Sequence, residues 1–302
     1  CLDIGIGDPE SLKRSINRFS KITKNSADNI LKYAGKEASE SIAGDIEFHE
    51  LDDKAISLDG YEAFVSEHRL ALSLTIDDAN LNTKRWDDLR IHSISVGKQD
   101  SFGVPPIFAM FNMLKSDYML ARWLTYCALN EVIPDSGYYA DTLDYANYGT
   151  KYSMLTLAQK SAIDVLDKLT VASLEYLNIG GAKNASFKKS WFNQSKANLP
   201  QWKQKIKNAI FDGNKPLIAL TELSQDFSGR KGYLKNISSL RNAATHRYIA
   251  LHDMGDIQKI KSKSIEHYDI KNFTNSLIET LRVVRSSLIY FVEILRSNKE
   301  SR

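Results

Sequence analysis

The stretch that decides the fold is residues 273–295, which read FTNSLIETLRVVRSSLIYFVEIL. Apolar side chains recur in it every three or four residues, a spacing that places them on one face of an α-helix. The members of this stripe are Phe273, Leu277, Leu281, Val284, Leu288, Phe291 and Leu295. Because a helix buries such a face against other helices, the stretch predicts a helical bundle.

The segments upstream show the same kind of pattern. A long helix is predicted from Pro105-Pro106 to about Val132, and a second from Leu155 to Tyr176, ended by Gly180-Gly181. Shorter helices are predicted at 9–22, 26–33, 61–73, 201–211 and 215–226, and from Tyr233 into the region of His252. No pair of alternating strands joined by a hairpin turn stands out. The fold class is therefore expected to be all-α, an antiparallel helical bundle with an additional N-terminal helical segment.

Two domains are expected. Residues 35–58 mix Gly, Ser and acidic residues without a clear period, which is typical of a linker. We expect residues 1–84 to form an N-terminal helical region with this linker, and residues 85–302 to form the main helical domain. Since the chain begins at Cys1 and not at a methionine, we also expect further residues upstream.

Composition narrows the class of protein. The 40 basic and 37 acidic residues give a net charge of only +3, which does not by itself indicate a nucleic-acid-binding protein. The two cysteines, Cys1 and Cys127, form no disulfide framework and no metal-binding pair, so we expect a cytoplasmic protein. No apolar run is long enough to span a membrane. Since His, Cys and carboxylate residues do not cluster, neither a metal nor a cofactor is expected.

The segment that carries chemistry is residues 239–248, SLRNAATHRY. The imidazole of His246 can take or give a proton near neutral pH, and the guanidinium of Arg241 can hold phosphate oxygens as negative charge builds up. Asn242 could orient the histidine or bind a phosphate oxygen. The spacing alone is weak, since chance also produces it elsewhere in the chain, and an Arg and a His near a helix end often form a cap and a surface pair.

This segment resembles the R-x4–6-H signature of the HEPN superfamily, in the form with a polar residue after the arginine. Further similarity to one branch of that superfamily covers about residues 85–297 and rests on the following segments: Asp141–Tyr145, Leu166-Asp167-Lys168, Ser186-Phe187 with Trp191, and His252-Asp253. In that branch the domain commonly follows tetratricopeptide repeats, so residues 1–84 are either the tail of such an array or an independent helical region.

The resemblance implies a metal-independent endoribonuclease of the toxin or antiviral-defence type, which cleaves tRNA or single-stranded RNA by attack of the 2′-hydroxyl. Arg241, Asn242 and His246 would be its catalytic residues. The resemblance also implies a homodimer in which motif residues of both subunits meet. The alternative is a non-catalytic HEPN-like module that dimerises and binds nucleic acid or a protein.

Helical geometry limits how the pair can meet. Five residues along an ideal helix turn by about 140°, so Arg241 and His246 would not share a face of one helix. Either the helix is broken near Ala243-Ala244, or the site is assembled at a seam between helices, where these small side chains permit close approach.

Other residues are candidates for supporting roles. Tyr248 stands two residues after His246. This resembles some HEPN toxins in which a partner nucleotidyltransferase modifies the tyrosine at that position, so such an enzyme or an antitoxin is a candidate partner. The alternative is a tyrosine packed at the edge of the bundle. A carboxylate such as that of Asp167 could orient His246, although a surface ion pair is the simpler interpretation. Arg247 and His252 are further supporting candidates.

A basic window at residues 183–207 contains lysines interleaved with aromatic residues and no acidic residue. Lysines can contact phosphates and aromatic rings can stack on unpaired bases, so Lys188, Lys189 and Trp191 are predicted to contact RNA. The alternative is that the aromatic side chains belong to the core and the lysines to a solvated face.

Overall fold

A computed structural model describes part of the chain. The described residues are 60–73, 87, 89–91, 94, 105–141, 146–193, 201–227, 234, 237, 240, 248–253 and 263–300, with side chains described to residue 297. All of them belong to one compact unit made of residues 57–76 and 81–302. The helices predicted at 9–22 and 26–33 lie outside the described residues.

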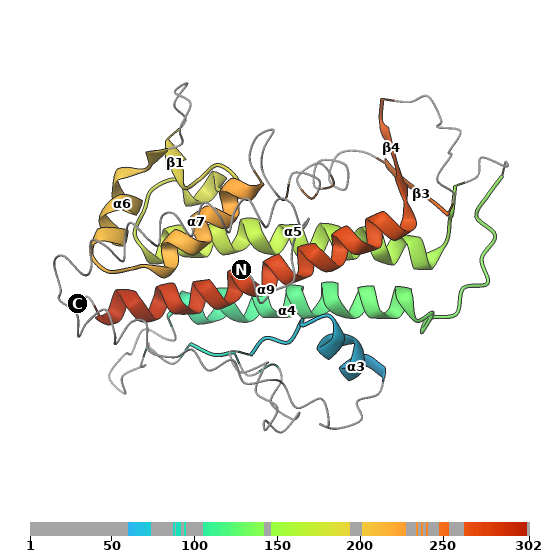
Figure 1. Cartoon of the computed structure of the whole chain (residues 1–302), viewed down its shortest axis with the longest axis horizontal. Coiled ribbons are helices and arrows are strands. Elements are labelled where there is room, and N and C mark those ends of the chain that lie inside the picture. Colours follow the sequence, from blue (N-terminus) through green and yellow to red (C-terminus); the bar gives the residue numbers. More distant parts are fainter. Residues whose placement is uncertain are drawn as a thin grey trace, which may run out of the picture. The chain divides into compact units, whose positions relative to one another are not determined.

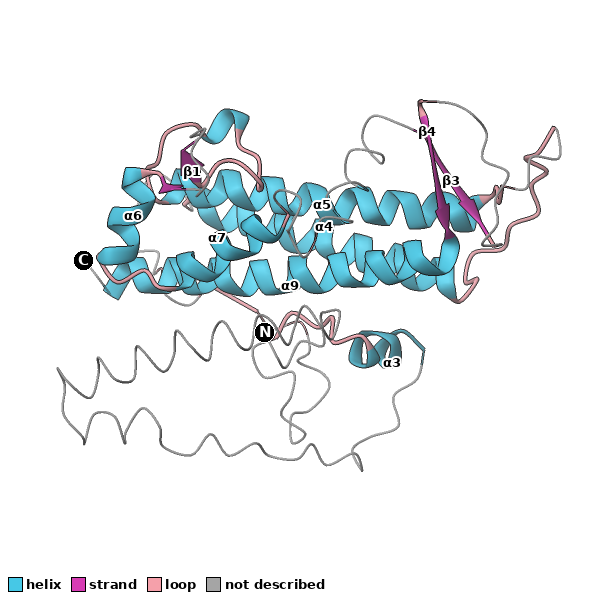
Figure 2. Cartoon of the chain, turned by 45° about the horizontal axis from the view of Figure 1, so that its top comes forward, coloured by secondary structure: helices cyan, strands magenta, loops and turns pink. Residues whose placement is uncertain are grey.

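Three long helices form the centre of this unit: α4 (Pro106–Leu129), α5 (Thr150–Tyr176) and α9 (Ile270–Glu300). They lie side by side in Figures 1 and 2. The helix α4 runs antiparallel to the other two. In contrast, α5 and α9 run in the same direction, since Gln159 bonds Thr280 and Tyr176 bonds the carbonyl of Leu295 further along both helices. The predicted all-α bundle is confirmed.

The apolar stripe of α9 lies in the core. All seven of its members are buried, and Phe291 packs against Phe111 of α4 with ring centroids 6.1 Å apart. The helix α4 begins at Pro106, because proline has no N–H to leave unpaired in the first turn. Within the part of the chain that the structure describes, no helix is long and apolar enough to cross a membrane.

Smaller elements cover the bundle. They are α3 (Gly60–Glu67), a 3-10 turn η3 (Ala182–Asn184), α6 (Gln204–Phe211), α7 (Pro216–Asp226), and the two-residue antiparallel strands β1 (Phe192–Asn193) and β2 (Gln201–Trp202). The helix predicted at 61–73 is shorter than expected. It ends before Arg69, whose φ of 54° is outside the helical range, and residues 70–73 continue without regular structure.

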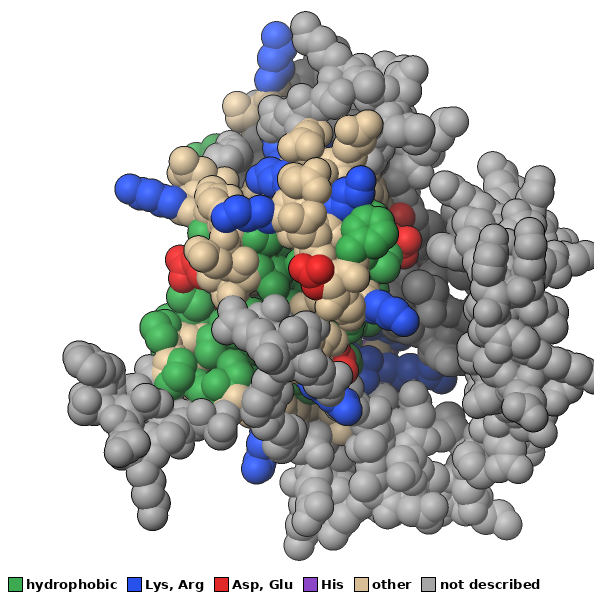
Figure 3. All heavy atoms as spheres, turned by 90° about the vertical axis from the view of Figure 1, so that its left-hand side faces the viewer, with side chains coloured by type: hydrophobic (Ala, Val, Ile, Leu, Met, Phe, Trp, Pro, Cys, Tyr) green, Lys and Arg blue, Asp and Glu red, His purple; other side chains and the backbone are tan. Residues whose placement is uncertain are grey.

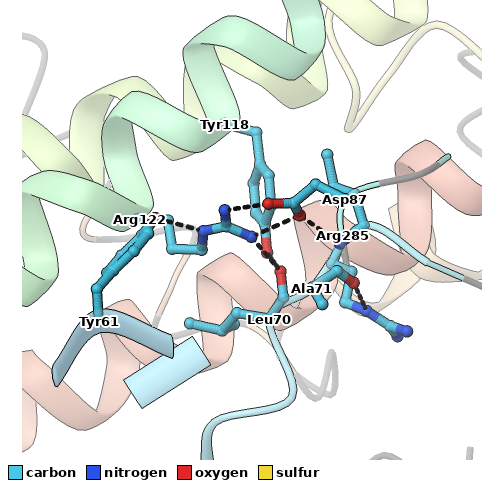
Figure 4. Close-up of polar contacts among 8 residues, drawn as sticks. Tyr61, Leu70, Ala71, Asp87, Tyr118, Arg122 and Arg285 are labelled. Carbon is cyan, nitrogen blue, oxygen red and sulfur yellow. Dashed lines mark hydrogen bonds and ion pairs between the residues drawn. The ribbon is translucent and has the colours of Figure 1, made fainter. Parts of the chain in front are cut away.

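Side chains of α4 and α9 bind the backbone of residues 70–73, which we call the 70–73 segment (Figure 4). The carbonyl of Leu70 accepts hydrogen bonds from the Tyr118 hydroxyl at 2.7 Å and from Arg122 at 3.0 Å. Arg285 of α9 donates from Nε to the carbonyl of Ala71 at 2.6 Å. These bonds satisfy buried carbonyls that have no partner in a helix or sheet, and so fix the segment on the bundle.

The centre of this network is an ion pair between Arg122 and Asp87. The guanidinium of Arg122 bonds both carboxylate oxygens, at 2.9 and 2.6 Å, and its Nε donates to the Tyr61 hydroxyl at 2.7 Å. One Asp87 oxygen also accepts the N–H of Leu72 at 2.8 Å. Burial alone would raise the pKa of Asp87, but the hydrogen bonds and charge of Arg122 bring it below its ordinary value.

The prediction of a helix from Tyr233 into the region of His252 is wrong at its C-terminal end. Tyr248–His252 form strand β3, which pairs in parallel with β4 (Ile265–Asp269). The intervening residues 253–264 are enough for the connection that two parallel strands require. The segment YIALH has no clear alternation, so its strand conformation depends on a partner strand distant in the sequence.

Asp226, the last residue of α7, gives the fold a pH dependence. Burial, with a smaller effect of Glu222, raises its pKa to about 6 from an ordinary value of 3.8. The folded protein therefore disfavours the charged carboxylate, and the free energy of unfolding should fall as the pH rises from about 4 to about 6. We expect Asp226→Asn to stabilise the half-buried site by about 1–2 kcal/mol at pH 7 and to have little effect at pH 4. Urea unfolding at both values checks this, and an equal effect at both pH values would contradict it.

Candidate functional site

The predicted catalytic residues Arg241, Asn242 and His246 lie outside the described residues, as does Arg247. The residues on either side of the motif are described. Leu240 is helical and buried, and Tyr248 is the first residue of β3. The motif therefore stands in the sequence between a helical residue and the first residue of a strand.

The strand that follows the motif is held by a pair of histidines. Nε2 of His252 lies 2.9 Å from Nδ1 of His267 in β4. The parallel register places Ala250 opposite His267, so both imidazoles lie on the same side of the two strands. His252 is only 1% exposed. This contact between the two rings joins β3 to β4, and His252 supports the strand next to the motif.

Tyr248 is exposed to solvent. Its side chain is 76% exposed, so the interpretation of a tyrosine packed at the edge of the bundle is wrong. Farther along β3, the carbonyl of Leu251 accepts the N–H of Asn147 at 2.8 Å, just before α5 begins at Thr150. The strand after the motif therefore lies beside the N-terminal end of α5.

Charges near this end of α5 are paired with one another. Lys151 donates to Glu131 at 2.9 Å, and this hydrogen bond raises the pKa of the lysine. Asp135 accepts hydrogen bonds from the Thr150 N–H and the Tyr139 hydroxyl, which lower the pKa of its carboxyl. These contacts tie the loop that precedes α5 to the first turn of the helix.

Asp167 has a structural partner. Its Oδ1 accepts the N–H of Phe187 at 2.8 Å, which fixes the turn after η3 to the side of α5. It stands 17 residues after Thr150, about 25 Å along the helix axis. Orientation of His246 by this carboxylate stays a prediction.

The prediction that Trp191 stacks on RNA is wrong. Its side chain is fully buried and packs edge-on against Phe187, with ring centroids 6.4 Å apart. The alternative, that these aromatic residues belong to the core, is correct. Lys189 is exposed and Lys188 is half-buried, in the turn that Asp167 holds. The structure therefore places β3, which contains Tyr248 and His252, beside the start of α5, and it places Lys188 and Lys189 toward the other end of that helix.

Among the exposed aromatic residues that were missed from the sequence, one lies next to the basic window. Phe211, at the end of α6, is 75% exposed, although it lies just outside the basic window. A helical projection could have found it, because it places Phe211 on the side of α6 away from the buried Ile206. Among the residues that can be placed, no group of three or more His, Cys, Asp or Glu side chains could hold a metal ion.

Comparison with known proteins identifies one family. A family model described as LA2681-like HEPN matches residues 98–298, which include α4 to α9 and the segment from Arg241 to His246. No curated protein matches the chain. No solved structure matches it either.

Proposed function

Because the chain belongs to the LA2681-like HEPN family, we propose that it is a metal-independent endoribonuclease of the toxin or antiviral-defence type. HEPN domains are often ribonucleases. The observation that carries the proposal is that the matched residues contain Arg241, Asn242 and His246 at the spacing of the HEPN signature. The proposed substrate is tRNA or single-stranded RNA in the cytoplasm.

The chemistry needs only the substrate and two side chains. The 2′-oxygen of a ribose forms a bond to the adjacent phosphorus as its proton passes to the imidazole of His246. The bond from phosphorus to the 5′-oxygen breaks, and that oxygen takes up a proton from water. Arg241 stabilises the negative charge on the two non-bridging oxygens through paired N–H donors, with Asn242 beside it. The products are a 2′,3′-cyclic phosphate and a 5′-hydroxyl.

Described residues on both sides of the motif are anchored in the fold. Leu240 is anchored in the core on one side, and β3 is anchored on the other side through His252 and His267. We place the site at a homodimer interface, where the motifs of two subunits would meet. The exposure of Tyr248 would leave its hydroxyl accessible to a partner nucleotidyltransferase.

Cleavage of RNA in excess EDTA tests the proposal. We expect the protein to cut a single-stranded RNA under these conditions and to leave 2′,3′-cyclic phosphate ends detectable by mass spectrometry. A matched oligonucleotide with a single 2′-deoxyribose at the cut position should resist cleavage there, because it lacks the nucleophile. Cleavage of the deoxy position, or activity that disappears with EDTA, would contradict the mechanism. Binding of RNA without any cleavage would instead favour the non-catalytic module.

A further inference from the structure

The exposed face of α6 combines basic, amide and aromatic side chains. Ile206 is fully buried, and the helical period places Gln204, Lys207, Asn208 and Phe211 on the side away from it, while the half-buried Lys203 precedes the helix as its N-cap residue. We call these five residues the α6 face. Nζ of Lys207 lies 5.8 Å from the centroid of the Phe211 ring. A large aromatic side chain is therefore held open to solvent beside a cation.

This face belongs to the most basic part of the sequence. Residues 177–215 contain eight lysines and a single acidic residue, Asp212, whereas the whole chain has a net charge of only +3. Two contacts bring these lysines close to one another in the fold. The side chain of Lys205 donates to the carbonyl of Asn178, just after α5. The N–H of Lys203 donates to the carbonyl of Trp191, which follows the turn with Lys188 and Lys189. Figure 3 looks onto this end of the bundle and shows Lys and Arg side chains spread over it with hydrophobic side chains among them.

Such a surface matches the chemistry of an unpaired nucleic acid strand. Lysines attract phosphates, and an exposed aromatic ring stacks on a base only when that base is unpaired. The side-chain amides of Gln204 and Asn208, joined by a hydrogen bond of 2.8 Å, add donors and acceptors. We propose that the α6 face binds single-stranded RNA, with Phe211 stacked on a base and with Lys203 and Lys207 on the adjoining phosphates.

The α6 face lies far from the strand that follows the catalytic motif. Figures 1 and 2 show α6 and the β3–β4 pair at opposite ends of the bundle. The helix α5, which runs between these ends, has 27 residues and is about 40 Å long. A stacked strand rises about 3.4 Å per nucleotide, so about a dozen nucleotides separate the two places. The α6 face is therefore a second contact for long RNA, remote from the cut; this role rests on the proposed function.

Binding of RNA by a variant that cannot cut it tests the inference. In the His246→Ala background, Phe211→Ala should weaken binding of a 20-nucleotide single strand about tenfold, and Phe211→Trp should retain it. The double variant Lys203→Glu/Lys207→Glu should weaken binding and flatten its salt dependence. The matched controls are Leu157→Ala and Lys160→Glu, which change exposed residues of α5 outside this basic part of the chain. A duplex of the same length should be insensitive to Phe211→Ala.

The outcomes separate this inference from the proposed function. If the wild-type protein binds single strands through Phe211 but cuts none, the α6 face stands and the ribonuclease proposal fails. If the protein cuts RNA but the Phe211 and lysine variants bind it as the controls do, the α6 face is not an RNA site. With both correct, the α6 variants should slow cleavage of a 30-nucleotide RNA and leave cleavage of a five-nucleotide RNA unchanged.

Discussion

Replacement of His246 by alanine is expected to slow RNA cleavage by about 10²–10⁴-fold while leaving the melting temperature unchanged. The imidazole accepts the proton of the 2′-hydroxyl, and no other group is assigned to that step in the proposed mechanism. Single-turnover cleavage of a labelled RNA measures the effect. A loss below about tenfold, with the fold intact, would remove His246 from the catalytic site.

Two further variants separate the roles of charge and geometry at the same site. Arg241→Lys keeps the positive charge but loses the paired N–H donors, so it should retain only a small part of the activity; Arg241→Ala should lose still more.

The Arg241→Ala and His246→Ala proteins, each inactive alone, should recover partial activity when mixed if residues of both subunits form one site. Absence of recovery, with a monomer in sedimentation at micromolar concentration, would contradict the dimeric site.

Replacement of Arg122 by methionine is expected to lower the free energy of unfolding by about 3–5 kcal/mol. Arg122 is 3% exposed and bonds Asp87, Tyr61 and the carbonyl of Leu70, so its loss takes the guanidinium away from a partly exposed carboxylate, a half-buried hydroxyl and a buried carbonyl. Urea unfolding followed by circular dichroism measures the change.

A double-mutant cycle and an exposed pair provide controls. Adding Asp87→Asn to the Arg122 variant should recover part of the loss, because no unpaired carboxylate then remains. The ion pair between Lys168 and Asp117 is more exposed, and Lys168→Met should cost less than about 1 kcal/mol. Equal losses at Arg122 and Lys168 would show that the network around Asp87 is not a main source of stability.

The helices could be predicted from the sequence because their periodicity is local. The stripe from Phe273 to Leu295 and the proline start of α4 need no knowledge of distant residues. The strand β3 could not be predicted, because its conformation depends on pairing with β4 and on a contact between His252 and His267. The end of α3 was missed for a similar reason, since side chains from α4 and α9 bind the 70–73 segment.

The candidate site is predictable only in part. Chemistry can be assigned to Arg241 and His246 from residue type and spacing, but a helical projection separates them by about 140°, so sequence alone cannot say how they meet. In the basic window, composition could not distinguish the buried ring of Trp191 from an exposed one. The exposed ring of Phe211, just outside this window, could have been found by a helical projection of the helix predicted at 201–211.

The way the 70–73 segment is bound also affects how the protein should be prepared. A recombinant fragment trimmed to residues 98–298, the limits of the family match, would lack Leu70, Leu72 and the carboxylate of Asp87. It would uncover apolar surface on α4 and α9, and it would remove the carbonyl of Leu70 from Arg122 and the carbonyl of Ala71 from Arg285. Such a fragment would tend to aggregate, so samples for nuclease assays should start upstream of residue 60.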